Sequence, residues 1–416
     1  MRLLHTADWH LGHSLHRFRR HAEHARFLDW LLDQLEEHAV DALLVAGDVF
    51  DTANPPSQAL RAWYGFLARA RARMPALDIV VIGGNHDSAA RLDAPRPLLE
   101  ASGVRVVGGL AVHEDGELDV DSMVVPLTDA SGAVAAWALA VPFLRLSDLP
   151  AAVAPADGVR ARYAAVAAHA RERMQPGQAL IALGHAYLTG TALSELSERK
   201  VLGGNQHALP TAVFPEDATY VALGHMHLAQ EIATGIRYPG APLPLSFGER
   251  TYPHQILLVD LDGDAIEAIT PVPVPRSVDL LAVPEEGDLP LAELVEVLAE
   301  LPDLDGTIEP DQEEDEDLLP FLEVRVRLDG PMPGLRQAVE AAVVGKAVRL
   351  VRIATSYTGT GRNLAEGPRA GRTLSDLSPE EVLRERWARD YEGEPDQPLL
   401  DAFHEVLDQV HQAEAT

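Results

Sequence analysis

The chain has 416 residues, 47% of them hydrophobic, which is enough to bury a large core and to form two or three folded units. It contains no cysteine, which excludes disulfides and thiolate metal sites. With 64 acidic against 34 basic residues, the net charge is −30. Most nucleic-acid-binding proteins hold phosphate with a positively charged surface, so this net charge has the opposite sign to the one expected for them.

Residues 1–270 alternate between strand and helix signals. Near-continuous apolar runs, typical of strands buried on both faces, occur at 3–5, 42–46, 79–82, 180–183 and 220–223. Two sets of side chains between them recur at helical spacing and are expected to pack in a core: Phe27, Trp30, Leu31 and Leu35, then Leu60, Trp63, Tyr64 and Leu67. This alternation predicts a layered α/β fold whose loops gather at the carboxyl ends of the strands.

After residue 230 the pattern changes to short strands and turns. It predicts a β-hairpin that closes a first domain of residues 1–270, followed by a stiff, extended linker in the proline-rich segment 271–275. Residues 277–355 resemble a small α+β module. Its strand signals lie at 279–283, 322–328 and 347–353, and its helix signals at 289–301 and 335–344. The acidic block 309–317 favours a solvated loop.

Residues 356–416 begin as a polar tether and end in two amphipathic helices. The first is predicted to begin at Ser378, which caps a helix whose first position is Pro379. The second places six apolar side chains on one face: Leu399, Leu400, Phe403, Val406, Leu407 and Val410. This stripe either docks on its own domain or binds a partner helix, and the long tether favours the partner.

The apolar pattern does not indicate a membrane protein. The first residues lack the apolar core of a signal peptide, and the longest apolar stretch, 133–144, contains a proline and is too short to cross a bilayer. We therefore expect a cytoplasmic protein without membrane contact.

Five polar motifs follow apolar runs, at 8–10, 47–48, 84–87, 184–185 and 224–227. They carry carboxylate, amide and imidazole groups, which are the ligands of a pair of divalent metal ions. A consistent assignment gives one ion Asp8, His10, Asp48 and His227, and gives the other Asp48, Asn85, His185 and His225. Two such ions activate water and stabilise both the attacking and the leaving oxygen of a phosphoryl transfer.

Two residues beside Asn85 are not needed as ligands. His86 is placed to protonate a leaving oxygen or to neutralise charge in the transition state. Asp87 is expected to orient His86 by a hydrogen bond. We assign both to catalysis.

This order of motifs resembles the calcineurin-like metallophosphoesterases. Further segments, at 8–12, 46–52, 55–57, 84–88, 222–227, 244–247 and 373–382, resemble the SbcD-type nuclease subunits of bacteria, a branch of the meiotic-recombination nuclease family. The similarity spans nearly the whole chain. It implies a metallophosphoesterase β-sandwich flanked by helices, with 277–355 as a DNA-capping domain and 356–416 as a tether with partner-binding helices.

The resemblance also implies a function in DNA repair, recombination and replication. Such subunits are manganese-dependent homodimers that pair with an SMC-like ATPase of the SbcC type, whose coiled coil is gripped by the C-terminal helices. They act as double-strand exonucleases and as endonucleases on hairpin or blocked DNA ends, which implies a nucleoid-associated protein. Archaeal relatives carry a histidine where this chain has Asp51, so we leave Asp51 out of the catalytic set.

Several charged residues near the motifs stay open to two interpretations. Arg17, Arg19 and Arg20 form a local basic cluster that either contacts DNA phosphates or is a solvated face. The histidines outside the ligand pattern are expected mostly on the surface or on helices: His5, His13, His16, His21 and His24. A narrow basic groove and the ATPase are our hypothesis for how so acidic a chain holds DNA.

Two other functions compete with the nuclease. A phosphoesterase of small nucleotides would use the same metals, but it would not need the 140 or so residues after the catalytic domain. A scaffold that has lost its chemistry is disfavoured by the intact ligand series.

Overall fold

The structure is a computed structural model that describes residues 1–113, 117–150, 153–192, 208–304, 318–330 and 332–357, together with 383, 384, 387, 400 and 403. The chain divides into two units, Met1–Tyr357 and Thr358–Thr416. Of the predicted apolar stripe only Leu400 and Phe403 are described; Leu399, Val406, Leu407 and Val410 lie outside the described residues, as does the acidic block 309–317. No described helix is both long and apolar enough to cross a membrane.

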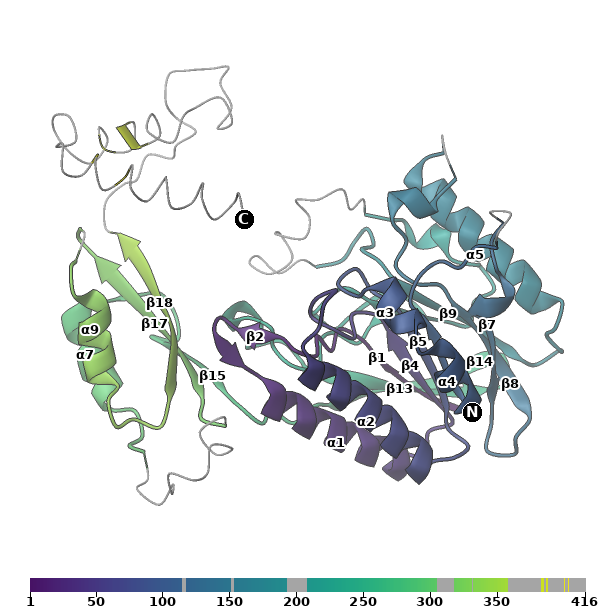
Figure 1. Cartoon of the computed structure of the whole chain (residues 1–416), viewed down its shortest axis with the longest axis horizontal. Helices are drawn as coiled ribbons and strands as arrows, with labels where there is room; N and C mark the ends of the chain where they lie inside the picture. The colour runs from purple at the N-terminus through teal and green to yellow at the C-terminus, as the bar shows by residue number, and fades with distance from the viewer. Residues whose placement is uncertain are drawn as a thin grey trace. The chain divides into compact units, whose positions relative to one another are not determined.

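Two six-stranded sheets form the first unit's larger part (Figure 1). One has the order β14-β13-β1-β4-β5-β6, with β1 (Arg2–Thr6), β4 (Ala42–Ala46), β5 (Asp78–Ile82), β6 (Val104–Val107), β13 (Gln255–Asp262) and β14 (Ala265–Pro273). The other has the order β11-β12-β10-β9-β8-β7, with β7 (Val124–Thr128), β8 (Val134–Ala140), β9 (Ala179–His185), β10 (Tyr220–Gly224), β11 (Gln230–Ala233) and β12 (Ile236–Tyr238). Strands β1, β4, β5 and β6 run parallel, as do β8, β9 and β10.

Alternate residues of the central strands enter two different cores. Leu3 and Leu44 pack between the two sheets, whereas Leu4 and Leu43 face α1 (His21–Glu37) and α2 (Ser57–Arg73). Helix α5 (Pro155–Arg171) covers the outer face of the second sheet. Figure 1 shows these helices on opposite sides of the paired sheets. The predicted layered α/β fold is confirmed, and Trp63 is a buried core residue as expected.

Shorter elements connect these layers. They are the hairpin β2 (Ser14–Leu15) and β3 (Phe18–Arg19), α3 (Ala89–Asp93) and α4 (Arg96–Ala101), and the 3₁₀ turns η1 (Asp121–Met123), η2 (Leu146–Asp148), η3 (Thr211–Val213) and η4 (Phe247–Glu249). The predicted linker 271–275 begins as strand, because Pro273 pairs with Gln255 at the end of β14. Proline is tolerated there since β14 is an edge strand and the missing N–H would face away from the sheet.

A smaller all-parallel sheet follows. It contains β15 (Leu280–Val283), β16 (Leu289–Pro290), β17 (Phe321–Leu328) and β18 (Arg349–Tyr357), with β17 pairing with the other three strands. Helices α7 (Leu291–Ala299) and α9 (Leu335–Ala342) share its apolar core. The strands and helices predicted for residues 277–355 correspond to these elements. The two-residue strand β16 was not predicted, because residues 289–290 were assigned to the start of a helix.

One buried polar contact joins the two large sheets. His5 on β1, one of the histidines outside the ligand pattern, is fully buried. Its Nδ1 lies 2.8 Å from the Tyr220 hydroxyl on β10, and its Nε2–H donates to the carbonyl of Leu223 at 3.1 Å. Burial lowers the pKa of His5 to about 3, so the ring is neutral at physiological pH.

The depressed pKa of His5 predicts acid sensitivity. In the unfolded chain His5 binds a proton near pH 6.5, whereas in the folded chain it stays neutral down to about pH 3. The contribution of His5 to stability is therefore fully present above pH 6.5 and is lost as pH falls toward 3. Replacing both partners (His5→Phe with Tyr220→Phe) removes one such proton. We expect the pH slope of the urea-unfolding free energy between pH 6 and 4.5 to fall by as much as about 1.4 kcal/mol per pH unit.

His113→Ala is the matched control, because His113 is largely exposed and its removal leaves the slope unchanged. An unchanged slope in the double variant would contradict the assignment of His5 as a buried neutral group.

Candidate metal centre

The predicted ligands meet where the strands of both sheets end. Beyond β1 and β4, the amide of Asp8 donates to the carbonyl of Gly47 at 3.0 Å, and the amide of His10 donates to that of Asp48 at 3.1 Å. In the second sheet Gly224 and His185 are paired in register at the ends of β10 and β9. Backbone pairing therefore continues into the motifs and fixes the positions of their side chains.

The backbone at this junction is unusual. Asp8, His10, Asp48 and His225 all have positive φ, of 55°, 45°, 49° and 103°. Non-glycine residues rarely adopt this conformation, and each instance costs roughly 1–3 kcal/mol. Strain gathered at four proposed ligands and held by the two sheets is typical of a functional site.

Glycines in the motifs permit close approach. A Cβ on Gly84 would lie 2.1 Å from Oδ1 of Asp48, and one on Gly47 would lie 2.3 Å from Nδ1 of His185. Both distances are far inside van der Waals contact. Only glycine at these positions lets the Asp48 carboxylate and the His185 ring come together.

Distances between donor atoms place all seven predicted ligands in one cluster. Within three groups the candidate atoms lie within 4.8 Å of one another: Asp8, His10 and His227; His10, Asp48 and His86; and Asp8, Asp48 and His185. Asn85 joins through its Oδ1, which is 2.9 Å from His185 Nε2 and 2.9 Å from His225 Nδ1. Asp48 lies at the centre, between His10 at 3.6 Å and His185 at 3.4 Å.

The cluster fits divalent cations. His10 is buried and neither of its ring nitrogens forms a hydrogen bond, although each faces a carboxylate oxygen, of Asp48 or of Asp51. Polar atoms so placed normally have a partner, and a metal ion supplies one. Imidazole, carboxylate and amide oxygen together suit manganese, iron or zinc.

The charges of the buried groups are strongly coupled. Burial opposes ionisation of Asp48, yet the neighbouring His185 and His10 hold its pKa well below the usual range. Burial disfavours the charged form of His185 as well, but Asp48 raises its pKa to about 9. Because a ligand imidazole must be neutral, a cation held by His185 would displace its proton and would bind more tightly as pH rises.

Hydrogen bonds set which nitrogen each imidazole presents to the cluster. His185 Nδ1–H donates to the carbonyl of Ala46 at 2.8 Å, and His227 Nδ1–H donates to Glu249 Oε1 at 3.1 Å. In both rings Nε2 is left as the ligand atom. Glu249, fully buried, was missed in the sequence, although the motif 244–247 that precedes it was singled out.

His86 and Asp87 have different surroundings from those expected. His86 Nδ1–H donates to the carbonyl of Asp51 at 2.8 Å, and its amide donates to Asp48 Oδ1 at 2.8 Å. Asp87 instead accepts hydrogen bonds from the amides of Val49, Phe50 and Gly84. The structure thus makes Asp87 the link between two ligand loops, and the Asp51 carbonyl orients the His86 ring.

Only part of the predicted arginine cluster is accessible. Arg17 and Arg19 are exposed, but Arg20 is buried. It pairs with Glu23 at 2.6 Å and 2.8 Å, donates to the carbonyl of Pro244, and packs 5.9 Å from the ring of Phe321 at the small sheet. The interpretation of Arg20 as a DNA contact is wrong, because its guanidinium is buried and already forms an ion pair with Glu23.

Two family models match the chain. Residues 1–229 match the calcineurin-like phosphoesterases, and residues 276–391 match SbcD_C, described as the type 5 capsule protein repressor C-terminal domain. The chain is 40% identical to the D subunit of nuclease SbcCD from Rhodobacter capsulatus, over 92% of this chain and 93% of that protein. Identity to the protein of the same name in Escherichia coli K12 is 32%, over 96% of both chains.

A more distant similarity is to the DNA double-strand break repair protein Mre11 of Methanopyrus kandleri. It is 29% identical over 60% of this chain and 50% of that protein.

The Glu249–His227 hydrogen bond predicts a defect in metal binding. In Glu249→Gln the buried charge that orients His227 is lost, and we expect affinity for Mn²⁺ to fall 10- to 100-fold in a calorimetric titration. Glu231→Gln, the same substitution at a largely exposed glutamate of β11, is the control and should leave the affinity unchanged. Equal affinities for the two variants would show that Glu249 does not position His227.

Proposed function

Because the chain belongs to the calcineurin-like phosphoesterases, and within them to the SbcD-type nuclease subunits, we propose that it hydrolyses DNA phosphodiesters with two bound manganese ions. The observation that carries this proposal is the convergence of seven residues with nitrogen and oxygen donor atoms, with the buried Asp48 at their centre. Asp48 lies 3.6 Å from His10 on one side and 3.4 Å from His185 on the other, a position from which its carboxylate could bridge two ions. When bound, such ions activate water and stabilise both oxygens of the displacement.

His86 supplies the proton that the leaving oxygen needs. Its Nδ1–H is held by the Asp51 carbonyl at 2.8 Å, so Nε2 is the atom that holds or releases a proton. The ring is half-buried and edge-on to His10, with 4.8 Å between ring centroids, at the open side of the cluster. Asp8 accepts a hydrogen bond from the backbone amide of His225, and this contact links the loops that follow β1 and β10.

The partners follow from the relatives and from the second matched family. The named relatives belong to a nuclease called SbcCD, which supports a complex with an SbcC-type, SMC-like ATPase acting on DNA ends and hairpins. We propose a homodimer in which 1–270 is the nuclease domain, 277–355 caps DNA, and 356–416 carries the helices that bind the ATPase. The match over 276–391 supports a role for this part that a small-substrate phosphoesterase would not need.

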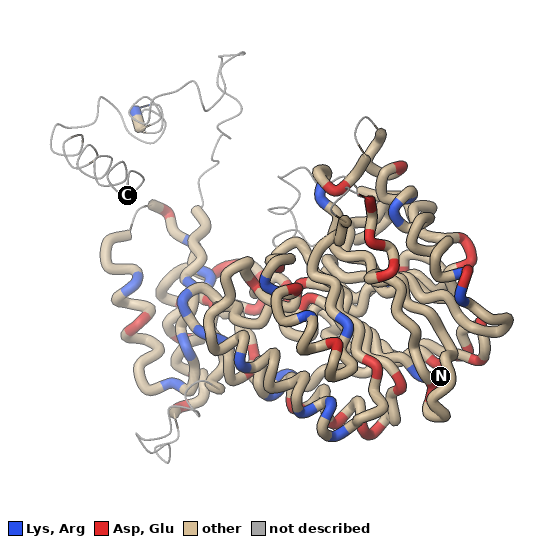
Figure 2. Tube along the Cα trace, turned by 45° about the vertical axis from the view of Figure 1, so that its right-hand side comes forward, with Lys and Arg blue, Asp and Glu red and all other residues tan. Residues whose placement is uncertain are grey.

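A groove beside the metal cluster offers a path for the DNA backbone. It has a volume of about 1040 Å³ and begins at Leu11–His13, directly after His10. Exposed Arg19, Arg26 and Arg61 line it, and none of the described residues that line it is acidic. Elsewhere acidic and basic positions are interspersed along the chain (Figure 2). With arginines and no acidic residue among its described lining, the groove is suited to bind phosphate.

Nuclease activity tests the function. On linear and hairpin-ended duplex DNA with Mn²⁺, we expect the wild-type chain, with its ATPase, to cut, and His86→Ala to cut about 100- to 10,000-fold more slowly. Metal content measured on both should be equal. Hydrolysis of small phosphodiesters without DNA cleavage, even with the ATPase, would favour the small-substrate enzyme instead.

The groove predicts a change in salt dependence. Replacing Arg19, Arg26 and Arg61 together by glutamine should weaken DNA binding. It should also reduce the magnitude of the slope of log affinity against log salt by about 2–3, since each lost phosphate contact contributes close to 0.9. Arg73→Gln is the control, because Arg73 already pairs with Asp33 and Glu36 on α1. An unaltered slope in the triple variant would exclude the groove as the DNA path.

A further inference from the structure

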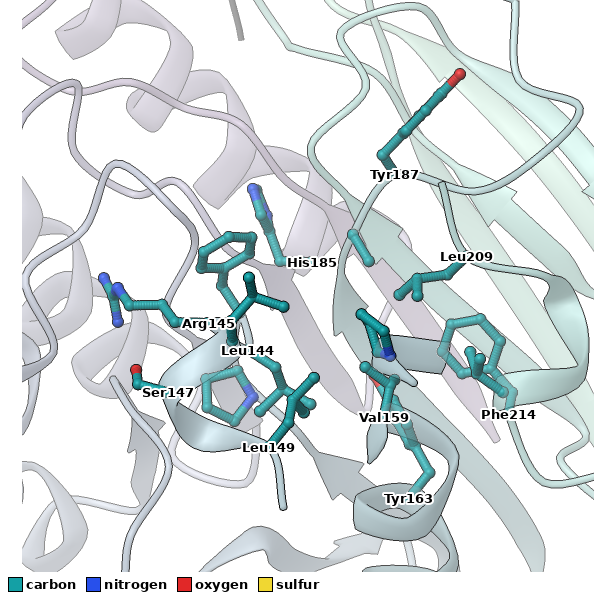
Figure 3. Close-up of a pocket in the computed structure, with 16 residues that line it drawn as sticks. Leu144, Arg145, Ser147, Leu149, Val159, Tyr163, His185, Tyr187, Leu209 and Phe214 are labelled. Carbon is teal, nitrogen blue, oxygen red and sulfur yellow. The ribbon is translucent and has the colours of Figure 1, made fainter. Parts of the chain in front are cut away.

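A second cavity is lined in part by His185 and shares no lining residue with the arginine groove. It has a volume of about 430 Å³ and lies between the segment 142–149, the start of α5 and the residues around η3. Its walls are mostly apolar: Phe143, Leu144, Leu149, Val159, Leu209 and Phe214. Figure 3 shows the leucine side chains of 144 and 149 facing Leu209, Val159 and Phe214 across the cavity.

The cavity adjoins the metal centre at one shared residue, His185. His185 lines the cavity, and its Nε2 lies 2.9 Å from Asn85 Oδ1 in the ligand cluster. The ring of Phe143 meets that of His185 edge-on, with 6.1 Å between centroids. Because the same ring belongs to the donor cluster and forms part of the cavity wall, the cavity is the apolar space next to a phosphate held at the metals.

The walls favour a group that has apolar faces and carries negative charge at one end. Aromatic rings and aliphatic side chains form the interior, while exposed Arg145 lies at the rim, 5.8 Å from the centroid of the Phe143 ring. Protein interiors rarely leave empty apolar space of this size, and small-molecule sites begin at about 300 Å³. A nucleobase attached to a phosphorylated sugar has this combination of shape and charge.

We propose that this cavity receives the unstacked base of the nucleotide next to the scissile phosphate, an inference that rests on the proposed nuclease function. The enzyme then cuts where a base leaves the stack at low cost, at frayed ends and in single-stranded loops. Burial against Phe143 and the leucine walls offsets the cost of unstacking, without hydrogen bonds that would select a particular base.

An oligonucleotide with a single abasic nucleotide tests the proposal on the wild-type, full-length chain with its ATPase. Cleavage is measured linkage by linkage on end-labelled single strands with Mn²⁺. We expect the linkage beside the abasic position to be cut about tenfold more slowly than in the intact strand, while distant linkages are unaffected. Equal rates at that linkage would overturn the proposal without touching the nuclease function, whereas no cleavage of any strand would overturn both.

A filled cavity gives the complementary result. In Val159→Trp the indole occupies the cavity, so cleavage of intact strands should fall about tenfold and the abasic position should cause no further loss. Val153→Trp is the matched control, because Val153 is exposed and does not line the cavity. Equal metal content in both variants and the wild type shows that the centre is intact. A Val159→Trp enzyme that keeps the full abasic effect would overturn the proposal.

Discussion

The close approach of backbone to the Asp48 carboxylate is the constraint on which the site depends. Asp48 is buried with left-handed backbone geometry, and Gly84 and Gly47 leave room for its oxygens and for His185. Any side chain at either glycine would separate the ligands. The strain at Asp48 and its neighbours is offset elsewhere, by two sheets whose pairing continues past the strand ends.

The two sheets are needed because neither holds a complete ligand set. The first supplies Asp8, His10 and Asp48, and the second supplies His185 and the loop with His225. Their relative position is fixed by an apolar core and by the buried contact between His5 and Tyr220. A polar contact inside such a core tolerates little displacement, because a shift would leave both groups without partners. It therefore holds the two halves of the site in register.

The sequence predicted that these donor residues would meet because each one follows an apolar strand, and parallel strands end at a common edge. It could not predict roles that depend on distant partners. Arg20 looked like part of a basic cluster, but its environment includes Pro244 and Phe321, more than 200 residues away. Asp87 was assigned to its neighbour His86, whereas the geometry of two turns aims its carboxylate at the amides of the other loop. Glu249 carries no local signal of its partnership with His227.

The net charge of the chain says little about whether it binds nucleic acid. Charges farther apart than about 8–10 Å are largely screened at physiological salt, so a ligand responds to the surface it touches. On α1 the acidic residues Asp29, Asp33 and Glu36 are paired with Arg69 and Arg73 of α2, and none of these acids lines the groove. The groove itself begins one residue beyond a proposed metal ligand and is lined by arginine without acid among its described residues. Under the proposed function, these arginines attract the phosphate backbone to a path beside the metal centre, whatever the sign of the net charge.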